Sequence, residues 1–210
     1  MPILEKVKHK FVLQPNGIDN YWHGHISHDE RRGHDILYVG DFSANKNVVR
    51  LAEAVLELRK ENGFNDVRLK IVGGEVKGGG RRNDGKTQAV IDANPEAIMA
   101  LGKIYDKDKL SEVMRSCSVF AMPSIYETFG LVYLEALSQN LPVVYTKGQG
   151  IDGMFDDTVG IGVNPLSVEE IKNALKLILQ DSIKYSNQHV CFDDFKWSEI
   201  AGKYISMYKD

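Results

Sequence analysis

The sequence predicts an α/β fold with a Rossmann-like parallel sheet and helices on both of its faces. Short apolar runs without polar alternation recur along the chain, as expected of strands that are buried on both faces. Segments with helical spacing separate these runs, and such alternation favours a parallel sheet. Gly40, Gly73 and Gly102 mark the ends of three of the runs. Ligands bind beyond the carboxyl ends of the strands in such folds, so the loops after these runs are the first candidates for a site.

Strands and helices alternate through the first half of the chain. The run ILYVG ends at Gly40, and the segment after it carries Val48, Leu51 and Val55 at helical spacing. A short helix is expected to stop before Pro95, because the residue before a proline avoids helical geometry. This half is expected to contain strands at 36–40, 67–73 and 98–101 and helices at 45–60, 87–93 and 109–117.

The second half continues the pattern. Pro123 stops a strand, and Ser167 with Glu170 forms a capping box at the start of a helix. The expected elements are strands at 119–122, 141–146 and 159–163 and helices at 130–139, 167–179 and 197–208. Two turn-rich segments, 15–33 and 73–84, interrupt the alternation without resembling domain linkers, and the second is expected to be mobile.

Composition and charge exclude several classes of protein. The 210 residues carry a formal net charge of −3, which indicates a globular domain without the basic excess of a nucleic-acid binder. Cys117 and Cys191 have the spacing of neither a zinc motif nor a disulfide framework. No apolar run reaches the roughly 18 residues of a membrane span, and residues 1–10 lack the apolar core of a signal peptide. We therefore expect a cytoplasmic protein. A group of histidines fits no metal-binding signature: His23, His25, His28 and His34.

The most informative segment follows the strand that ends at Met122. Glu127 precedes a predicted helix and Gly130 lies in its first turn, where free N–H groups and the helix dipole suit a phosphate. Glu135 lies among apolar residues of the same helix, so its carboxylate needs hydrogen-bond partners. Ribose hydroxyls are one candidate, and a backbone amide or a lysine is the other. A glycosidase pair of Glu127 and Glu135 is disfavoured, because the second is too buried in its helix to activate water.

Three further loops carry candidate ligand groups. Lys46 follows the strand that ends at Gly40 and could reach a diphosphate, although a solvated surface lysine is the commoner case. Neither GxxxxGK[ST] nor GxGxxG occurs there. The backbone of Lys103 and Ile104 could meet a flat base edge or form a connecting turn. The glycine-rich loop 148–153 could face a sugar or simply connect two elements.

The string ETFGLVYLEAL, which contains Glu127 and Glu135, resembles the E-x7-E segment of the retaining glycosyltransferases of family 4, which have the GT-B fold. Other segments occur in the family's order: PNGID at 15–19, YVG at 38–40 followed by Lys46 and Asn47, LKIVG at 69–73, LGKI at 101–104 and SVFAMPS at 118–124. The resemblance covers about residues 12–208. It implies one half of a GT-B fold, with a nucleotide-sugar (donor) binding domain at 1–210 and the N-terminal acceptor domain absent from this chain.

The resemblance implies a role for each candidate residue. Lys46 would neutralise the leaving diphosphate and Glu127 would lie near the sugar, so these two are the expected catalytic residues. Glu135 would bind the ribose hydroxyls. The other expected donor-binding residues are Gly40, Asp41, Lys103, Ile104, Phe129, Gly130 and Leu131. The donor substrate is a nucleotide-diphosphate sugar, and no metal or other cofactor is implied.

Asp41 departs from the family's pattern, which commonly has an arginine directly after the glycine of this loop. An acid at this position would repel phosphate unless it turns away or binds the sugar. Arg81, Arg82 or Lys147 could supply the missing cation. The departure puts activity or donor identity in question.

The expected function is donor binding in a retaining glycosyltransferase of polysaccharide or glycolipid synthesis. The sugar or glycolipid acceptor would bind through the missing N-terminal domain, so the isolated domain is expected to be inactive, and the full-length protein could associate peripherally with a membrane. Two alternatives stay open: a catalytically degenerate nucleotide-sugar-binding module, and a nucleotide-sugar epimerase of the GT-B fold. Without the other domain, apolar residues of the last helix should be partly exposed, namely Trp197, Ile200, Tyr204 and Ile205.

Overall fold

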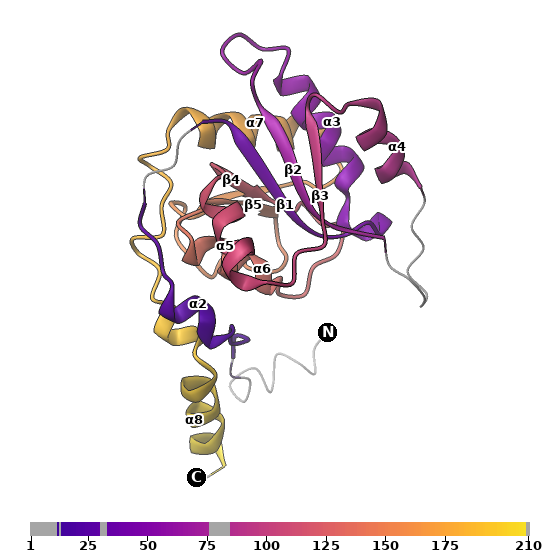
Figure 1. The fold of residues 1–210 in the computed structure, drawn as a ribbon. Helices are drawn as coiled ribbons and strands as arrows, with labels where there is room; N and C mark the ends of the chain where they lie inside the picture. The colour runs from indigo at the N-terminus through magenta and orange to yellow at the C-terminus, as the bar shows by residue number, and fades with distance from the viewer. Residues whose placement is uncertain (1–11, 13, 30–32, 76–84, 209–210) are drawn as a thin grey trace, which may run out of the picture.

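A parallel sheet of six strands forms the centre of the molecule in the computed structural model, which describes residue 12 and residues 14–29, 33–75 and 85–208 (Figure 1). The strand order is β3-β2-β1-β4-β5-β6. The strands are β1 (Asp35–Asp41), β2 (Arg68–Gly74), β3 (Ile98–Gly102), β4 (Val119–Ala121), β5 (Val143–Thr146) and β6 (Gly160–Val163). Every neighbouring pair is parallel, so the predicted Rossmann-like sheet is confirmed.

Helices cover both faces of this sheet, as the continuous apolar strands predicted. On one face α3 (Val48–Leu58) packs against α4 (Lys86–Ala93) and α7 (Val168–Gln180). Figure 1 shows α5 (Lys107–Arg115) and α6 (Leu131–Ser138) on the other face. Near the ends of those two helices, the Arg115 guanidinium donates to the side-chain oxygen of Gln139 at 2.8 Å.

Two helices begin elsewhere than the hydrophobic spacing predicted. The helix expected at 45–60 begins at Val48, because Asn47 adopts a left-handed conformation (φ 59°) and the preceding residues form a separate 3₁₀ turn, η2 (Ala44–Lys46). The helix expected at 109–117 begins two residues earlier, because the Asp106 carboxylate accepts the free N–H groups of its first turn. Both boundaries are set by single residues in loops that follow strands, Asn47 through its backbone conformation and Asp106 through its side chain.

The direction of the chain connections changes at β1, which lies between β2 and β4. The loops that leave the carboxyl ends of β1 and β4 therefore diverge, and this is the position where such sheets bind ligands. β1 and β2 approach closely here: a Cβ at Gly73, where φ is +142°, would lie 1.7 Å from the carbonyl oxygen of Gly40. Gly73 is therefore required by the packing of the sheet itself.

Segments near the two ends of the described chain lie together, where the Ile18 N–H donates to the Phe195 carbonyl at 2.9 Å. Two short elements in this region, α2 (Asn20–Gly24) and η3 (Phe192–Phe195), were not predicted. The last helix, α8 (Trp197–Met207), extends away from the sheet (Figure 1). Ile200 was expected to be partly exposed but is only 2% exposed, because α8 packs its first turns against η3.

The other apolar residues of α8 expected to be exposed are indeed about half exposed: Trp197, Tyr204 and Ile205. No helix within the described ranges has both the length and the apolar character that crossing a membrane requires. The part of the glycine-rich segment at 76–84, expected to be mobile, lies outside the described residues.

Candidate active site

Lys46 and Glu127 form an ion pair that joins the two diverging loops. Lys46 ends η2 in the loop after β1, and Glu127 lies in the loop after β4. The Lys46 ammonium donates to Oε2 of Glu127 at 2.8 Å, and the side chains are only 18% and 11% exposed. The two residues predicted to be catalytic are therefore brought together, although they are 81 positions apart. Lys46 is a partly buried cation at the switch point and not a solvated surface lysine.

Gly130 sets the geometry at the start of α6. It is the residue before the helix and has φ +76°, a conformation that glycine adopts without strain. A Cβ at this position would lie 2.5 Å from the ring of Tyr133, one turn into the helix. As the N-cap residue, Gly130 makes no side-chain hydrogen bond to the first N–H groups of the helix, which begins at Leu131 directly after Phe129 and Gly130. Packing against Tyr133 is a reason for the glycine that does not depend on a ligand.

Glu135 is partly buried on α6, and burial raises the pKa of its carboxyl group above the ordinary value. The side chain of Trp22 on α2 donates a hydrogen bond to it, which lowers the pKa in part. Lys107, at the start of α5, contributes a favourable charge and itself pairs with Asp19 at 2.6 Å. The sequence left a ligand, a backbone amide or a lysine as partners for Glu135, and the indole of Trp22 was not foreseen.

The remaining donor-binding candidates border a pocket of about 470 Å³ at the carboxyl edge of the sheet. It is lined by Gly40 and Asp41 from β1 and by Lys103 and Ile104 from the loop after β3. The Lys103 ammonium donates to the carbonyl of Glu75 at 3.0 Å, which fixes it across this pocket. Four candidates, two at the end of β1 and two in the loop after β3, are thus brought together.

The carboxylate of Asp41 turns back into its own loop, where Oδ1 accepts the N–H of Ser43 at 2.8 Å. The Tyr38 hydroxyl donates to the Asp41 carbonyl at 2.6 Å and holds the same turn. Of the cations proposed as substitutes for the missing arginine, Lys147 lines a separate pocket with Tyr145 beyond β5. Arg81 and Arg82 lie outside the described residues.

Sequence reasoning missed the polar side chains that connect the loops. Asn47 is 4% exposed and donates to the carbonyl of Pro123 at 2.9 Å, and Asn45 and Gln149 also bond to the loop after β4. The only signal for them was a pair of asparagines around Lys46 directly after a strand, a pattern that also occurs in ordinary turns. Gln149 lies in the glycine-rich loop 148–153, so that loop contacts the site instead of simply connecting two elements.

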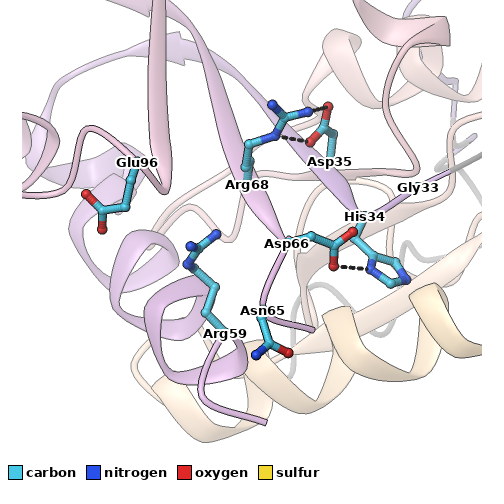
Figure 2. A pocket seen from close by; sticks show the side chains of 8 residues that line it. All are labelled: Gly33, His34, Asp35, Arg59, Asn65, Asp66, Arg68 and Glu96. Atoms are coloured by element: carbon cyan, nitrogen blue, oxygen red, sulfur yellow. Dashed lines mark hydrogen bonds and ion pairs between the residues drawn. The ribbon is translucent and has the colours of Figure 1, made fainter. Parts of the chain in front are cut away.

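A second group of charged residues lines a pocket of about 400 Å³ at the opposite, amino-terminal edge of the sheet (Figure 2). Figure 2 shows Arg68 against Asp35 and His34 against Asp66, with Arg59 and Glu96 facing the same space. Arg68 bonds both carboxylate oxygens of Asp35 at 2.9 and 3.0 Å, and His34 lies 2.8 Å from Asp66. Sequence analysis assigned nothing to this edge.

Three of the histidines that fitted no metal signature have separate hydrogen-bond partners, whereas both ring nitrogens of His23 are buried without one among the described residues. His25 bonds the carbonyl of Tyr21, and His28 bonds the side chain of Asn187. Among the described residues, no three His, Cys, Asp or Glu side chains gather in the manner of a metal site.

Comparison with known proteins gives concordant results. The sequence model of the family described as "Glycosyl transferases group 1" matches residues 27–189. The chain is 26% identical over 180 residues to a D-inositol 3-phosphate glycosyltransferase of Corynebacterium kroppenstedtii, a match over 83% of this chain and 40% of that protein. It is 24% identical over 180 residues to an uncharacterized glycosyltransferase of Methanocaldococcus jannaschii, of which it covers 44%. The chain thus spans less than half the length of these relatives.

Solved structures show the same fold. A glycosyltransferase from Rickettsia africae superposes with a TM-score of 0.74 at 16% identity, over 96% of this chain and 57% of that one. The C-terminal domain of a group 1 glycosyl transferase family protein from Francisella tularensis superposes with a TM-score of 0.64 at 20% identity, over 90% of this chain and 95% of that one.

Proposed function

The chain belongs to the glycosyl transferases of group 1, and on that premise we propose that it is the donor-binding domain of a retaining enzyme of family 4. Its donor is a nucleotide-diphosphate sugar, and the sugar is passed to an acceptor held by a second, N-terminal domain. Two facts support this assignment of donor and acceptor to separate domains. The chain spans less than half the length of its curated relatives, and it matches nearly all of a domain described as C-terminal.

The observation that carries the proposal is the Lys46–Glu127 pair across the switch point. An ammonium group has three N–H donors, and Glu127 takes one of them, so the others are available to a diphosphate. Positive charge from Lys46 and from the start of α6 would stabilise the diphosphate as it leaves. The proposed reaction therefore uses protein groups, with no metal or other cofactor, to neutralise the leaving group.

The proposal extends to the rest of the donor. Glu135 would accept hydrogen bonds from the ribose hydroxyls, since a partly buried carboxylate is a strong acceptor. The backbone of Lys103 and Ile104 would contact the base in the pocket after β3. Glu127 would lie beside the sugar, held between Lys46 and the start of α6. We place the acceptor among sugars or glycolipids, as in polysaccharide or glycolipid synthesis.

Calorimetry of the chain with UDP, GDP, ADP and CMP tests the proposal. We expect selective binding of one diphosphate, weakened by Lys46→Met and by Glu135→Gln. Lys60→Met is the matched control, because Lys60 is 68% exposed and pairs only with a neighbour on its own turn in the described structure. Binding of none of the nucleotides, or equal loss in the control, would contradict the proposal.

Asp41 favours a second candidate, a nucleotide-sugar-binding module without transferase activity. Asp41 lines the pocket at the carboxyl edge, where a negative charge would repel a phosphate. Nucleotide binding without any release of the diphosphate from the sugar donor, in a protein that contains both domains, would favour this module. Turnover there would exclude it.

A further inference from the structure

The backbone around Glu127 is hydrogen-bonded mainly to side chains, in the way that a strand is hydrogen-bonded to its neighbour in a sheet. Residues Ile125, Tyr126 and Glu127 follow β4 but belong to no strand. Five of their backbone N–H and C=O groups are nevertheless hydrogen-bonded to partners from two other loops.

Asn45 in η2 provides three of these hydrogen bonds. Its backbone carbonyl accepts the N–H of Ile125 at 2.8 Å. Its side-chain oxygen accepts the N–H of Tyr126 at 2.9 Å, while its side-chain nitrogen donates to the Tyr126 carbonyl at 2.9 Å. A single amide thus bonds both backbone groups of Tyr126, as a residue in an adjacent strand would.

Gln149 provides the other two from the loop after β5. Its side-chain oxygen accepts the N–H of Glu127 at 2.8 Å, and its side-chain nitrogen donates to the Ile125 carbonyl at 3.1 Å. Only an amide side chain combines a donor and an acceptor in the spacing of a peptide group. Asn45 and Gln149 therefore form an amide clamp on the stretch 125–127.

We propose that this amide clamp positions Glu127 against the donor sugar, with Asn45 and Gln149 as positioning residues. The inference rests on the proposed function, because it takes Glu127 as the residue beside the sugar. The Lys46–Glu127 pair needs the two loops at a fixed separation, and Asn45 is the residue directly before Lys46. Asn45 joins the same two loops, and Gln149 joins the loop after β5 to the loop after β4. Both side chains are neutral, so the clamp adds no charge to the site.

If the clamp positions Glu127, its loss should change the affinities for two ligands by different amounts. In the proposed site, contacts to the nucleotide come from Lys46, Glu135 and the loop after β3, whereas contacts to the sugar depend on Glu127. Loosening of the stretch 125–127 should therefore weaken binding of the nucleotide sugar more than binding of the free diphosphate. A purely structural role for the two amides would instead lower the affinity for both ligands together.

The test uses Asn45→Leu and Gln149→Met, which keep side-chain size, remove the amide and add no charge. The ligands are the diphosphate selected from UDP, GDP and ADP, and the glucose conjugate of that same diphosphate. We expect the affinity for the conjugate to fall at least fivefold, with the affinity for the diphosphate within twofold of wild type. Gln149→Glu keeps the acceptor for the Glu127 N–H and should give an intermediate loss.

Asn94→Leu is the matched control, because Asn94 also donates to a backbone carbonyl, that of Val90 at 2.8 Å, but lies at the end of α4. It should leave both affinities unchanged. Wild-type affinity for the conjugate in both clamp variants would overturn the inference, as would a parallel loss of both ligands accompanied by a lower melting temperature than the control. If the wild-type chain binds no diphosphate at all, the proposed function fails, and the role assigned to the clamp fails with it.

Discussion

The two edges of the sheet carry ion pairs that are nearly indistinguishable as pairs. At the carboxyl edge, Lys46 and Glu127 lie 2.8 Å apart and are 18% and 11% exposed. At the amino edge, Lys70 and Asp35 lie 2.9 Å apart and are 14% and 13% exposed. Neither the N–O distance nor the exposed fraction therefore distinguishes the ion pair of the candidate site from the ion pair at the other edge.

The difference lies in what holds each pair. Asp35 and Lys70 are residues of adjacent strands, so the sheet itself fixes them, and Arg68 satisfies the second side of the carboxylate. Lys46 and Glu127 lie on loops whose positions are not fixed by the hydrogen bonds of the sheet. The side-chain amides of Asn45 and Gln149 hold those loops together instead. The Lys46–Glu127 pair is held by dedicated side chains and lies at the edge where parallel sheets bind ligands. It is therefore the better candidate for a functional role.

Lys46→Met should give the largest effect, because it removes a cation from both the ligand and Glu127. We expect the affinity for the selected diphosphate to fall about 30-fold, as for the loss of a charge-assisted hydrogen bond of ~2 kcal/mol. The free energy of unfolding should fall by about 1–3 kcal/mol, since a mostly buried carboxylate loses its partner. Calorimetry and urea unfolding measure the two quantities.

The double variant Lys46→Met/Glu127→Gln separates the two effects. It removes the uncompensated charge, so the free energy of unfolding should return to within about 1 kcal/mol of wild type. Diphosphate affinity should stay low. Recovery of binding in the double variant would show that Lys46 matters only as a partner of Glu127.

Asp35→Asn tests the opposite edge. Arg68 and Lys70 would lose their carboxylate, so the free energy of unfolding should fall by about 2 kcal/mol. This is less than the roughly 3–5 kcal/mol for a broken buried pair, because Arg68 is 47% exposed. Diphosphate affinity should not change. Asp66→Asn in the same pocket is the control, since Asp66 is 71% exposed and its loss should cost less than about 0.5 kcal/mol. A large loss of binding in Asp35→Asn would overturn the distinction between the edges.

Glu135→Gln should lower diphosphate affinity about tenfold, because a neutral amide accepts hydrogen bonds from ribose more weakly than a carboxylate does. The same change should stabilise the free domain at neutral pH. Burial raises the pKa of Glu135 in the folded state, so the folded state takes up a proton more readily than the unfolded state. The stability that this group contributes is present below its unfolded pKa of about 4.5 and is lost as pH rises through the folded value.

The difference in melting temperature between Glu135→Gln and wild type should therefore shrink as pH falls from 7 toward 4. The other carboxylates that titrate in this range are common to both proteins and cancel in the difference. A constant difference across this pH range would mean that the carboxylate is not the cause.

Asp41→Asn should have the smallest effect on diphosphate affinity, and it should raise the affinity instead of lowering it. Asparagine keeps the side-chain oxygen that accepts the Ser43 N–H, so the loop should hold its shape. Removal of one negative charge near the diphosphate is worth roughly 0.5–1 kcal/mol at a solvated edge, which corresponds to about a threefold gain in affinity. Unchanged affinity would place the phosphates away from Asp41.

Much of this arrangement could be predicted from the sequence, because apolar periodicity reports which faces are buried. All six strands, and the helices of eight or more residues, were found in that way. The direction of the strands then showed at which edge of the sheet the loops with Lys46 and Glu127 lie. The start of α3 was misplaced because a left-handed Asn47 leaves no trace in hydrophobic spacing. Asn45, Gln149 and Trp22 were missed because each bonds a group far away in the sequence, and such pairing appears only once the loops are folded together.

The chain has two tryptophans, and their surroundings are very different. Trp22 is 1% exposed and bonds the carboxylate proposed to hold the ribose, whereas Trp197 on α8 is 51% exposed. Emission from Trp197 should thus lie at longer wavelength and be quenched by iodide, while Trp22 should emit at shorter wavelength and resist quenching. In Trp197→Phe, the remaining fluorophore lies beside Glu135, so occupation of the nucleotide site can be followed by intrinsic emission without any added label.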